Sequence, residues 1–316
     1  MAKVAFLFPG QGSAAVGMGD AIASASAAAR QVMHRFRALL PKVYAVCARG
    51  PTDQLIRTAN AQPAIFAVDC ACLAALDERN VRPDVVAGHS LGEYAALVAA
   101  SVVDFETGLR LVIERASLME KATAARPGKM LAVLGLGVGQ VATIVGAWAD
   151  RGIIANANDN APGQIIVSGD ASTLDAAAAD FRASGARVME LPVGGAFHSA
   201  LMREAEDVFV ATLEAAPFAD ARIPLISNLT AAASQDAATL KSALRAQITG
   251  SVRWRQSIDT MLADGANTFV EVGPGRILSG LVQRCTRDRS VRILNVEDPD
   301  SLERTAQALG AARHEE

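Results

Sequence analysis

The stretch VVAGHSLGEYAAL (85–97) limits the possible folds of this chain more than any other part of the sequence. Its apolar start predicts a short buried strand, and its end begins a helical pattern. Between them, the pattern Gly-x-Ser-x-Gly places Ser90 in a sharp strand-to-helix turn. Such a turn, called a nucleophile elbow, exposes the hydroxyl above the end of a sheet. Free N–H groups at the start of the helix suit a developing oxyanion. We therefore predict that Ser90 is a nucleophile.

Strands and helices alternate along most of the chain, which predicts a parallel sheet covered on both faces. The expected strands cover 3–8, 85–87, 223–227 and 268–272, and the expected helices cover 62–79, 105–122 and 200–215. Pro63 lies in the expected first turn of one helix, and Asp104 is the expected N-cap of another.

The pattern changes between residues 127 and 194. Strands are expected at 130–136, 153–157, 165–168 and 187–191, with helices at 140–149 and 172–184. This β-α-β-β-α-β order is typical of a ferredoxin-like unit. We therefore predict an α/β fold in which residues 1–126 and 195–316 form a large subdomain. Residues 127–194 form a small ferredoxin-like α+β subdomain inserted into it.

The composition favours a well-packed globular chain. Of the 316 residues, 51% are hydrophobic and 20% are charged, so a large core is feasible. The net charge of −3 gives no general electrostatic footprint for nucleic acid or for an anionic membrane, and we predict neither partner. The uncharged segment 130–149 is long enough to span a bilayer. Four glycines divide it, however, so a strand, a turn and a helix explain it better.

The cysteines give no sign of a metal site or of disulfide bonds. Cys47, Cys70, Cys72 and Cys285 lack metal-ligand spacing, and a chain of this size does not need disulfides for stability. The apolar run that begins at Lys3 is too short for a secretory signal. We predict reduced thiols, no metal and a cytoplasmic location.

A serine of ordinary acidity needs a general base. His34 lies in a charged stretch, His89 is adjacent to the serine and should point elsewhere, and His314 is in the tail. His198 follows a strand and Gly194-Gly195, where the chain re-enters the large subdomain. We predict His198 as the base by elimination and by context.

Several motifs together resemble the malonyl-CoA:acyl carrier protein transacylases, the acyltransferase family of fatty-acid synthesis with relatives in polyketide synthases. The motifs are FPGQGS (8–13), GHSLGEYAAL (88–97), NDNAPGQIIVSG (158–169), GAFHSALM (195–202) and EVGPGRILSGL (271–281). They occur in family order over nearly the whole chain. The resemblance implies an α/β-hydrolase-like core with a ferredoxin-like insertion, which agrees with the pattern above.

The resemblance also implies roles for residues at matching positions. Ser90 accepts malonyl from coenzyme A, and His198 acts as general base and then as general acid. The backbone N–H groups of Gln11 and Leu91 form the oxyanion hole. Malonyl-CoA is a substrate, and the chemistry requires no cofactor.

Three further roles concern the acyl group and the base. Arg115 is expected to hold the malonyl carboxylate, since arginine's planar fork binds carboxylates bidentately. It lies at the edge of the apolar stripe of its helix, from where its side chain could reach inward. Gln247, placed by its distance from SVRWRQS (251–257), is expected to orient His198 through its backbone carbonyl. Phe197 precedes the base as in relatives that prefer malonyl. Asn158 and Asn160 have the composition of a tight turn.

These expectations combine into a ping-pong transfer. The chain would pass malonyl from malonyl-CoA to the phosphopantetheine thiol of an acyl carrier protein through a malonyl-serine intermediate, for fatty-acid biosynthesis. We expect a monomer. Because such carriers are acidic, basic residues near the cleft would steer docking. The candidates are Arg276, Arg284 and Arg287.

Other functions remain open at this point. The elbow and the histidine fit a serine hydrolase such as a thioesterase equally well, although no acidic partner for His198 is evident. A non-catalytic carrier-binding module would not need Ser90, His198 and Arg115 together. Within the family, the sequence does not separate the fatty-acid role from a free-standing polyketide acyltransferase. Nor does it exclude the malonyl-transferring subunit of malonate decarboxylase.

Overall fold

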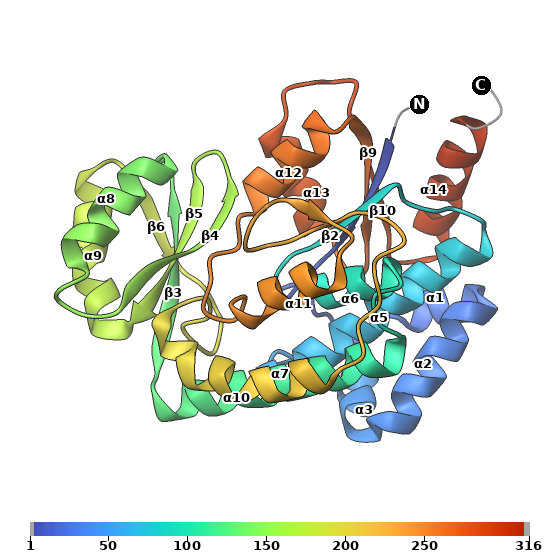
Figure 1. Cartoon of the computed structure of the whole chain (residues 1–316), viewed down its shortest axis with the longest axis horizontal. Helices are drawn as coiled ribbons and strands as arrows, with labels where there is room; N and C mark the ends of the chain where they lie inside the picture. Colours follow the sequence, from blue (N-terminus) through green and yellow to red (C-terminus); the bar gives the residue numbers. More distant parts are fainter. Residues whose placement is uncertain (1–2, 313–316) are drawn as a thin grey trace.

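The computed structural model describes residues 3–312 and contains two separate sheets (Figure 1). His314, which was set aside in the search for a base, lies outside the described residues. The larger sheet has six strands, in the order β10-β9-β1-β2-β7-β8. Its strands are β1 (Lys3–Phe8), β2 (Val85–Gly88), β7 (Leu225–Ile226), β8 (Ala233–Ser234), β9 (Ala266–Val272) and β10 (Arg292–Val296). All neighbours pair in parallel except β7 and β8. The predicted mostly parallel α/β core is therefore confirmed.

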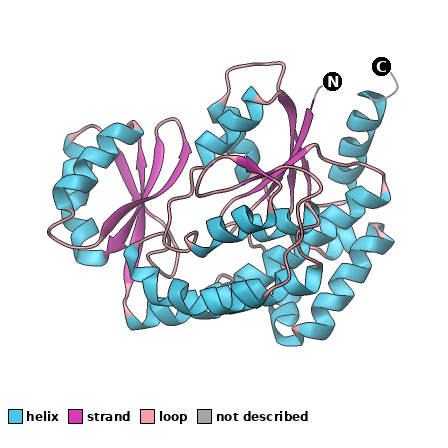
Figure 2. Ribbon diagram, in the orientation of Figure 1, coloured by secondary structure: helices cyan, strands magenta, loops and turns pink. Residues whose placement is uncertain are grey.

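Helices cover both faces of the large sheet (Figure 2). They are α1 (Asp20–Ala25), α2 (Ala27–Leu39), α3 (Pro41–Arg49), α4 (Thr52–Leu55), α5 (Thr58–Glu78), α6 (Gly92–Ala99), α7 (Phe105–Ala125), η1 (Ala200–Met202), α10 (Arg203–Ala215), α11 (Ala237–Arg245), α12 (Trp254–Ala263), α13 (Ile277–Cys285) and α14 (Pro299–Ala312). Successive side chains of a strand point to opposite faces. Accordingly, Phe6 and Phe8 of β1 join the core under α5 and α7, whereas Ala5 and Leu7 join the core under α12 and α13.

The smaller sheet forms the inserted unit at the left of Figure 1. Its elements are β3 (Gly128–Leu134), α8 (Val138–Trp148), β4 (Ile154–Ala161), β5 (Gln164–Asp170), α9 (Ala171–Ala183) and β6 (Arg187–Glu190). The strand order β4-β5-β3-β6 is antiparallel throughout. Side chains of α8 and α9 pack with this sheet in a third core. This is the ferredoxin-like arrangement expected from the sequence. The boundaries proposed at residues 127 and 194 stay a prediction.

Two local expectations are wrong. The strand expected to end at 157 continues as β4 through Asn158 and Asn160, so the turn is confined to 162–163. Both asparagines are buried, so tertiary contacts override their turn composition. Pro63 lies inside α5 rather than in its first turn, because the helix begins at Thr58.

The apolar segments belong to the core. The segment 130–149 contains most of β3, a loop and α8, as predicted. Helix α5 is long and apolar enough to cross a membrane, but 78% of its apolar window is buried inside the protein. It contacts α2, α3 and α7, which is the packing of a central core helix.

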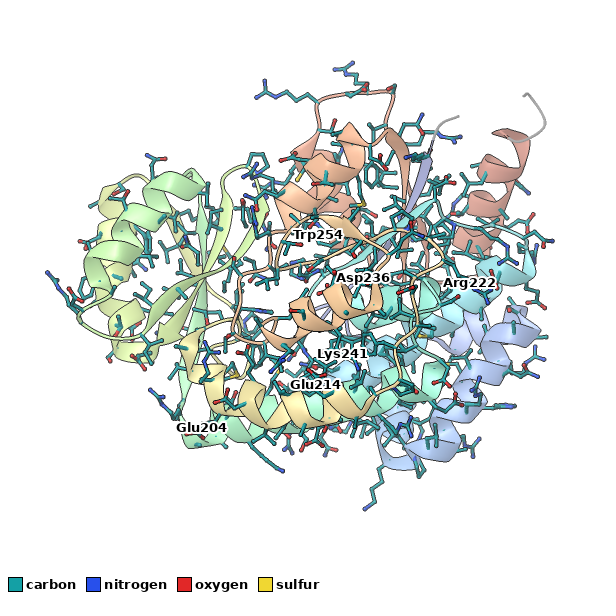
Figure 3. The ribbon with its side chains drawn as sticks, in the orientation of Figure 1. Glu204, Glu214, Arg222, Asp236, Lys241 and Trp254 are labelled. Atoms are coloured by element: carbon teal, nitrogen blue, oxygen red, sulfur yellow. The ribbon has the colours of Figure 1, made fainter. Side chains whose placement is uncertain are left out.

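Helix α11 lies between β8 and α12 in the chain and packs on α10. Lys241 of α11 donates hydrogen bonds to the carbonyls of Glu214 and Ala216, where α10 ends (Figure 3). A cation there also complements the negative end of the helix dipole. After α11, the chain passes Gln247 and Gly250 on its way to the fully buried Trp254.

Candidate active site

The strand-to-helix turn at Ser90 is a tightly packed elbow. Ser90 has a left-handed backbone with φ of 52° between the end of β2 and the start of α6. A Cβ on Gly88 would come within 2.0 Å of Gly92, and one on Gly92 within 2.0 Å of the carbonyl oxygen of Phe8. Only glycine therefore fits on either side. The Asn228 side chain accepts the Ser90 N–H at 2.6 Å and donates to the Gly88 carbonyl at 2.6 Å. These contacts hold the serine in its strained conformation.

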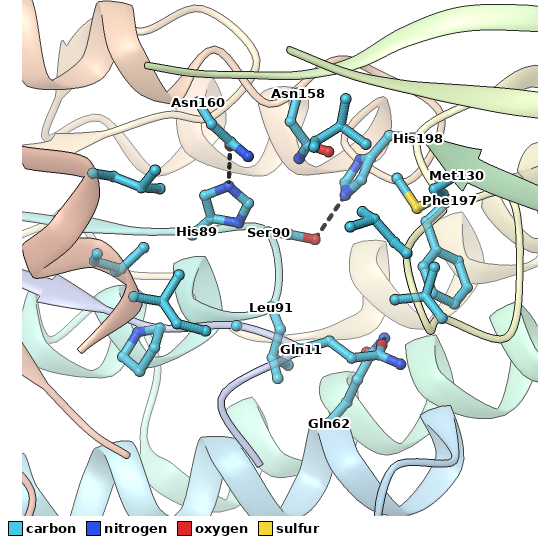
Figure 4. Close-up of a pocket in the computed structure, with 18 of the residues that line it drawn as sticks. Gln11, Gln62, His89, Ser90, Leu91, Met130, Asn158, Asn160, Phe197 and His198 are labelled. Atoms are coloured by element: carbon cyan, nitrogen blue, oxygen red, sulfur yellow. Dashed lines mark hydrogen bonds between the residues drawn. The ribbon is translucent and has the colours of Figure 1, made fainter. Parts of the chain in front are cut away.

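His198 faces Ser90 across the cleft (Figure 4). Its Nε2 lies 2.8 Å from the Ser90 Oγ. Its Nδ1 lies 3.0 Å from the Gln247 carbonyl and 2.9 Å from the Gly250 carbonyl. Since carbonyls only accept, Nδ1 carries the hydrogen and Nε2 is left to receive the serine proton. The geometry agrees with the expected orientation by the Gln247 backbone, and it adds Gly250.

Burial, the charge of Arg115 and the nearby His89 lower the pKa of His198 to about 3. Two backbone carbonyls that accept from Nδ1 partly oppose this effect. The imidazole is therefore neutral at ordinary pH, which is the form that can act as a general base.

The guanidinium of Arg115 is fully buried beside the nucleophile. Its Nη2 donates to the Ser90 Oγ at 2.9 Å and to the Gln247 Oε1 at 3.1 Å, and its Nη1 donates to the Gln62 Oε1 at 2.7 Å. Its Cζ also lies 5.6 Å from the centre of the Tyr94 ring, as in a cation–π contact. No carboxylate touches it among the described residues. The sequence placed Arg115 at the edge of an apolar stripe, whereas α7 buries it completely.

The two predicted oxyanion donors lie beside Ser90. The N–H groups of Gln11 and Leu91 donate to no other group in the described part of the chain. A Cβ on Gly10 would come within 2.4 Å of the His89 carbonyl oxygen, so the loop that carries Gln11 lies directly against the elbow. Free backbone donors next to a nucleophile are what a tetrahedral oxyanion needs.

These groups open into one cavity of about 200 Å³. Apolar side chains from both subdomains form much of its wall: Leu91, Met119, Met130, Ile166, Leu191, Val193, Phe197, Ile277, Leu278 and Leu281. Phe197 thus lies at the cavity, as predicted. His89 also lines it, but it points away from Ser90. Its Nε2 contacts the Asn160 Oδ1 at 2.8 Å (Figure 4). The cavity suits a short acyl group with one charged end.

Three polar residues of the site were missed from sequence. Gln62 contacts Arg115, and its Nε2 lies 3.3 Å from the Gln11 Oε1. Asn228 supports the elbow, and Glu93 lies beneath it, bonded to Asn228 and Gln247. Glu93 stands within the elbow motif itself, which was the available signal. The hydrogen bonds of Gln62 and Asn228 depend on contacts between distant segments and leave no local pattern.

The three arginines suggested for carrier docking lie around α13: Arg276 directly precedes the helix, Arg284 belongs to it, and Arg287 follows it. Arg284 donates to the Gln164 side chain of β5 at 2.5 Å. Arg276 lies 3.6 Å from Glu297, and Arg287 is exposed. Arg284 therefore connects the two subdomains as well as adding positive charge.

The assembled site has the parts of an acyl-transferring serine enzyme: a nucleophile, a neutral imidazole, free oxyanion donors and a buried cation. A family model for the "Acyl transferase domain" matches residues 5–307. The chain belongs to the acyl transferase domain family. The match includes both sheets and every site residue described above.

Individual members of the family are similar over their full lengths. The chain is 37% identical over 312 residues to the malonyl CoA-acyl carrier protein transacylase of Bacillus subtilis (strain 168), covering 98% of each chain. It is 37% identical to the solved acyl-carrier-protein-S-malonyltransferase of Bartonella henselae, with a TM-score of 0.93 over 98% of this chain and 100% of that one. A third match is a chain of the solved structure described as a type II PKS acyl-carrier protein in complex with its malonyl-transacylase. This chain is 32% identical to that one, with a TM-score of 0.93 over 97% of this chain and 100% of that one. The resemblance drawn from the motifs and the predicted fold class are confirmed.

Proposed function

We propose that this acyl transferase moves malonyl from malonyl-CoA to the phosphopantetheine thiol of an acyl carrier protein. The observation that carries the proposal is the guanidinium of Arg115, which is fully buried and 2.9 Å from the nucleophile oxygen. A buried cation without a carboxylate partner is costly unless a ligand supplies one. Malonyl bears a carboxylate one methylene away from its reacting carbonyl. A simple hydrolase of neutral esters has no use for such a group.

The first half-reaction loads the enzyme. His198 takes the proton of Ser90 as the serine oxygen attacks the thioester carbonyl of malonyl-CoA. The N–H groups of Gln11 and Leu91 stabilise the oxyanion. The C–S bond then breaks, coenzyme A leaves as its thiol with the proton from His198, and malonyl remains as an ester on Ser90.

The bound carboxylate also adjusts the base. In the free enzyme, Arg115 lowers the pKa of His198. A malonyl carboxylate on Arg115 offsets that charge, so the pKa of His198 rises when substrate binds. The imidazole becomes a better base at the moment when it must accept a proton.

The second half-reaction reverses the first with a different thiol. His198 deprotonates the phosphopantetheine thiol, the sulfur attacks the ester, and Ser90 regains its proton as malonyl leaves on the carrier. The acidic carrier would approach the basic side of the cleft at Arg276, Arg284 and Arg287. We infer a monomeric, cytoplasmic enzyme. Its four cysteines are free thiols, which supports a reducing compartment.

For the pathway, we propose fatty-acid biosynthesis. The test mixes enzyme and malonyl-CoA with phosphopantetheinylated carriers from fatty-acid, polyketide and malonate decarboxylase systems, and it measures malonyl-carrier and free malonate. Preferred transfer to the fatty-acid carrier supports the proposal. Preference for another carrier would reassign the pathway, and malonate without malonyl-carrier would indicate a thioesterase.

A further inference from the structure

A buried carboxylate lies directly beneath the nucleophile. Glu93 is in the first turn of α6 and is only 2% exposed, and it does not line the cavity. Its Oε1 accepts the Asn228 backbone N–H at 3.2 Å, and its Oε2 accepts the Gln247 Nε2 at 2.8 Å. Glu93 thus contacts the site only through two other residues.

Those two residues hold the reacting groups. The Asn228 side chain brackets the elbow through the Ser90 N–H and the Gly88 carbonyl. The Gln247 Nε2 also donates to the Ser90 carbonyl at 2.8 Å, and its Oε1 accepts from Arg115. The orientation of the Gln247 amide is therefore fixed by charge. Turning it over would place its NH₂ against the guanidinium and its oxygen against two acceptors.

The hydrogen-bond pattern favours an ionised Glu93. Both partners are N–H donors, which a carboxylate can accept but a protonated acid cannot fully match. Among the described residues, the charged or titratable groups that interact with Glu93 are the Arg115 guanidinium of α7 and the Tyr94 phenol of α6. Arg115 favours the ionised form, and burial opposes it.

We propose that Glu93 is a positioning residue for malonyl transfer, whose ionised carboxylate holds the Gln247 amide in the orientation that serves both Arg115 and Ser90. This inference rests on the proposed function. Since Glu93 does not line the cavity, this role requires no contact with the substrate. It also adds the acidic group that the Ser90–His198 pair lacks, placed behind the elbow rather than behind the histidine.

The pH dependence of malonylation follows from this arrangement. Burial raises the pKa of Glu93 to about 7, against hydrogen bonds from Gln247 and Asn228 and the charge of Arg115. As the pH falls through that value, the carboxyl gains a hydrogen that has no acceptor while Gln247 keeps its orientation. The Gln247 side-chain amide then turns over, and Arg115 loses the Gln247 oxygen that accepts its hydrogen bond. In the free enzyme, whose ionisations kcat/KM reports, the pKa of His198 is about 3, which is too low to produce a decline in this range. Wild-type kcat/KM should therefore fall on the acid side of neutrality.

The test uses Glu93→Gln, which keeps the shape but removes the charge. The glutamine oxygen can accept from only one of the two donors, the Asn228 N–H or the Gln247 NH₂. The glutamine NH₂ then faces the other donor. We expect malonyl loading of Ser90 at pH 8 to fall about tenfold to hundredfold, as for a small misplacement of reacting groups. The fall in kcat/KM on the acid side of neutrality, called the acid limb below, should disappear in this variant. Glu93→Asp retains a titrating carboxylate and should retain an acid limb.

Glu271→Gln is a matched control. Glu271 is also buried, its pKa is also raised by burial, and it accepts the N–H groups of Leu278 and Ser279 at the start of α13. It has no contact with Gln247. Its substitution should leave the midpoint of the acid limb where it is in the wild type.

The readout is the single-turnover rate of malonyl attachment to Ser90 between pH 5 and pH 9 at subsaturating malonyl-CoA, which reports the free enzyme, measured by quenched intact-protein mass. Loss of the acid limb in Glu93→Gln alone supports the proposal. A wild type without that limb, or a Glu93→Gln variant with an unchanged midpoint, overturns it. If Glu93→Gln does not fold, Glu93→Asp provides the test. An Asp variant that has lost the acid limb would also overturn the proposal. A wild type that takes up no malonyl at any pH would instead refute the proposed function.

Discussion

At the scale of single residues, Arg115 controls the electrostatics of the cleft. Burial lowers the pKa of its guanidinium, yet arginine stays charged at any ordinary pH. In the free enzyme, the charge is directed at neutral acceptors: the Gln62 and Gln247 side chains and the Ser90 hydroxyl. A substrate carboxylate can replace such contacts with a charge-assisted, bidentate pair. Selectivity for malonyl over acetyl would then depend on this one side chain.

Replacing Arg115 with alanine tests that dependence. We expect kcat/KM for malonyl-CoA to fall about 10- to 100-fold, the value of charged hydrogen bonds of about 1.5–3 kcal/mol. Acetyl-CoA has no carboxylate to lose, so its relative rate should rise. Steady-state transfer with both thioesters measures the ratio.

Arg110→Ala is the control for this substitution, since Arg110 is exposed on the same helix, donates a side-chain hydrogen bond to Thr107 and does not line the cavity. It should change neither rate. An equal loss of both acyl groups in Arg115→Ala would contradict a carboxylate clamp.

At this scale, the sequence predicted some residues of the site and missed others. Ser90 was recognisable because its motif is local, and His198 was found by eliminating three other histidines. The structure brings both together with Arg115, Gln11, Leu91 and Phe197 around one cavity. Gln247 does not line that cavity, but it contacts Ser90, Arg115 and His198. Gln62 and Asn228 were missed because their roles arise from contacts between segments far apart in the chain. Glu93 was missed because a glutamate in the first turn of a helix is an ordinary feature.

At the scale of elements, the elbow depends on the close approach of β1, β2 and α6. The Gly92 Cα lies against the Phe8 carbonyl at the end of β1, so α6 can start directly above the sheet. This contact places the start of α6, with the Leu91 N–H that donates to no other group among the described residues, beside the cleft. A longer side chain would push the helix and Ser90 away from His198.

Gly92→Ala should therefore damage both folding and activity. Its Cβ would lie 2.0 Å from a backbone oxygen, which cannot move as a flexible side chain can. We expect a loss of about 1–3 kcal/mol or more in the free energy of unfolding, as for other overpacked sites. Chemical denaturation measures it.

Gly146→Ala in α8 is the matched control. A Cβ there meets no atom within 4 Å, and the residue is helical and exposed. It should stabilise the protein by about 0.5–1 kcal/mol, since alanine favours a helix over glycine. If both substitutions had the same effect, the close contact at the elbow would not be limiting.

At the scale of the whole molecule, the cleft lies between two separately folded sheets. Strand β4 of the small sheet pairs with the segment before α12 through Asn158 and Val252. Arg255 of α12 adds a bidentate ion pair with Asp159, at 2.9 Å between Nη2 and Oδ2. These contacts hold the inserted unit at a fixed position over Ser90.

Breaking that ion pair should loosen the cleft. Asp159 is 9% exposed, so Asp159→Asn leaves Arg255 with a weakened partner in a partly buried place. We expect a stability loss of about 1–3 kcal/mol and slower malonyl loading. Asp264→Asn breaks the exposed pair with Lys3 and should cost only about 0–1 kcal/mol with no change in rate. Equal effects of the two variants would show that the contact between subdomains is not rigid.

The architecture was more predictable than its details. Periodicity predicted four strands of the large sheet and the inserted β-α-β-β-α-β order, because most of those strands are buried. It did not predict β8 and β10, which are mostly exposed or only partly buried. It failed at NDNAPG, where three polar residues continue β4. There, the Asn160 side chain contacts the His89 ring. Asp159 forms an ion pair with Arg255, and Asn158 forms a β-bridge with Val252. A strand segment of consecutive polar residues has no alternating pattern from which to recognise it.

The most direct test of the central claim is the mass of the intact protein after a brief incubation with malonyl-CoA. The account predicts one malonyl group, mapped to Ser90, absent from Ser90→Ala and removed when an acyl carrier protein is added. Acetyl-CoA should replace malonyl-CoA poorly. Free malonate without any adduct, or an adduct on a residue other than Ser90, would contradict the malonyl-serine intermediate.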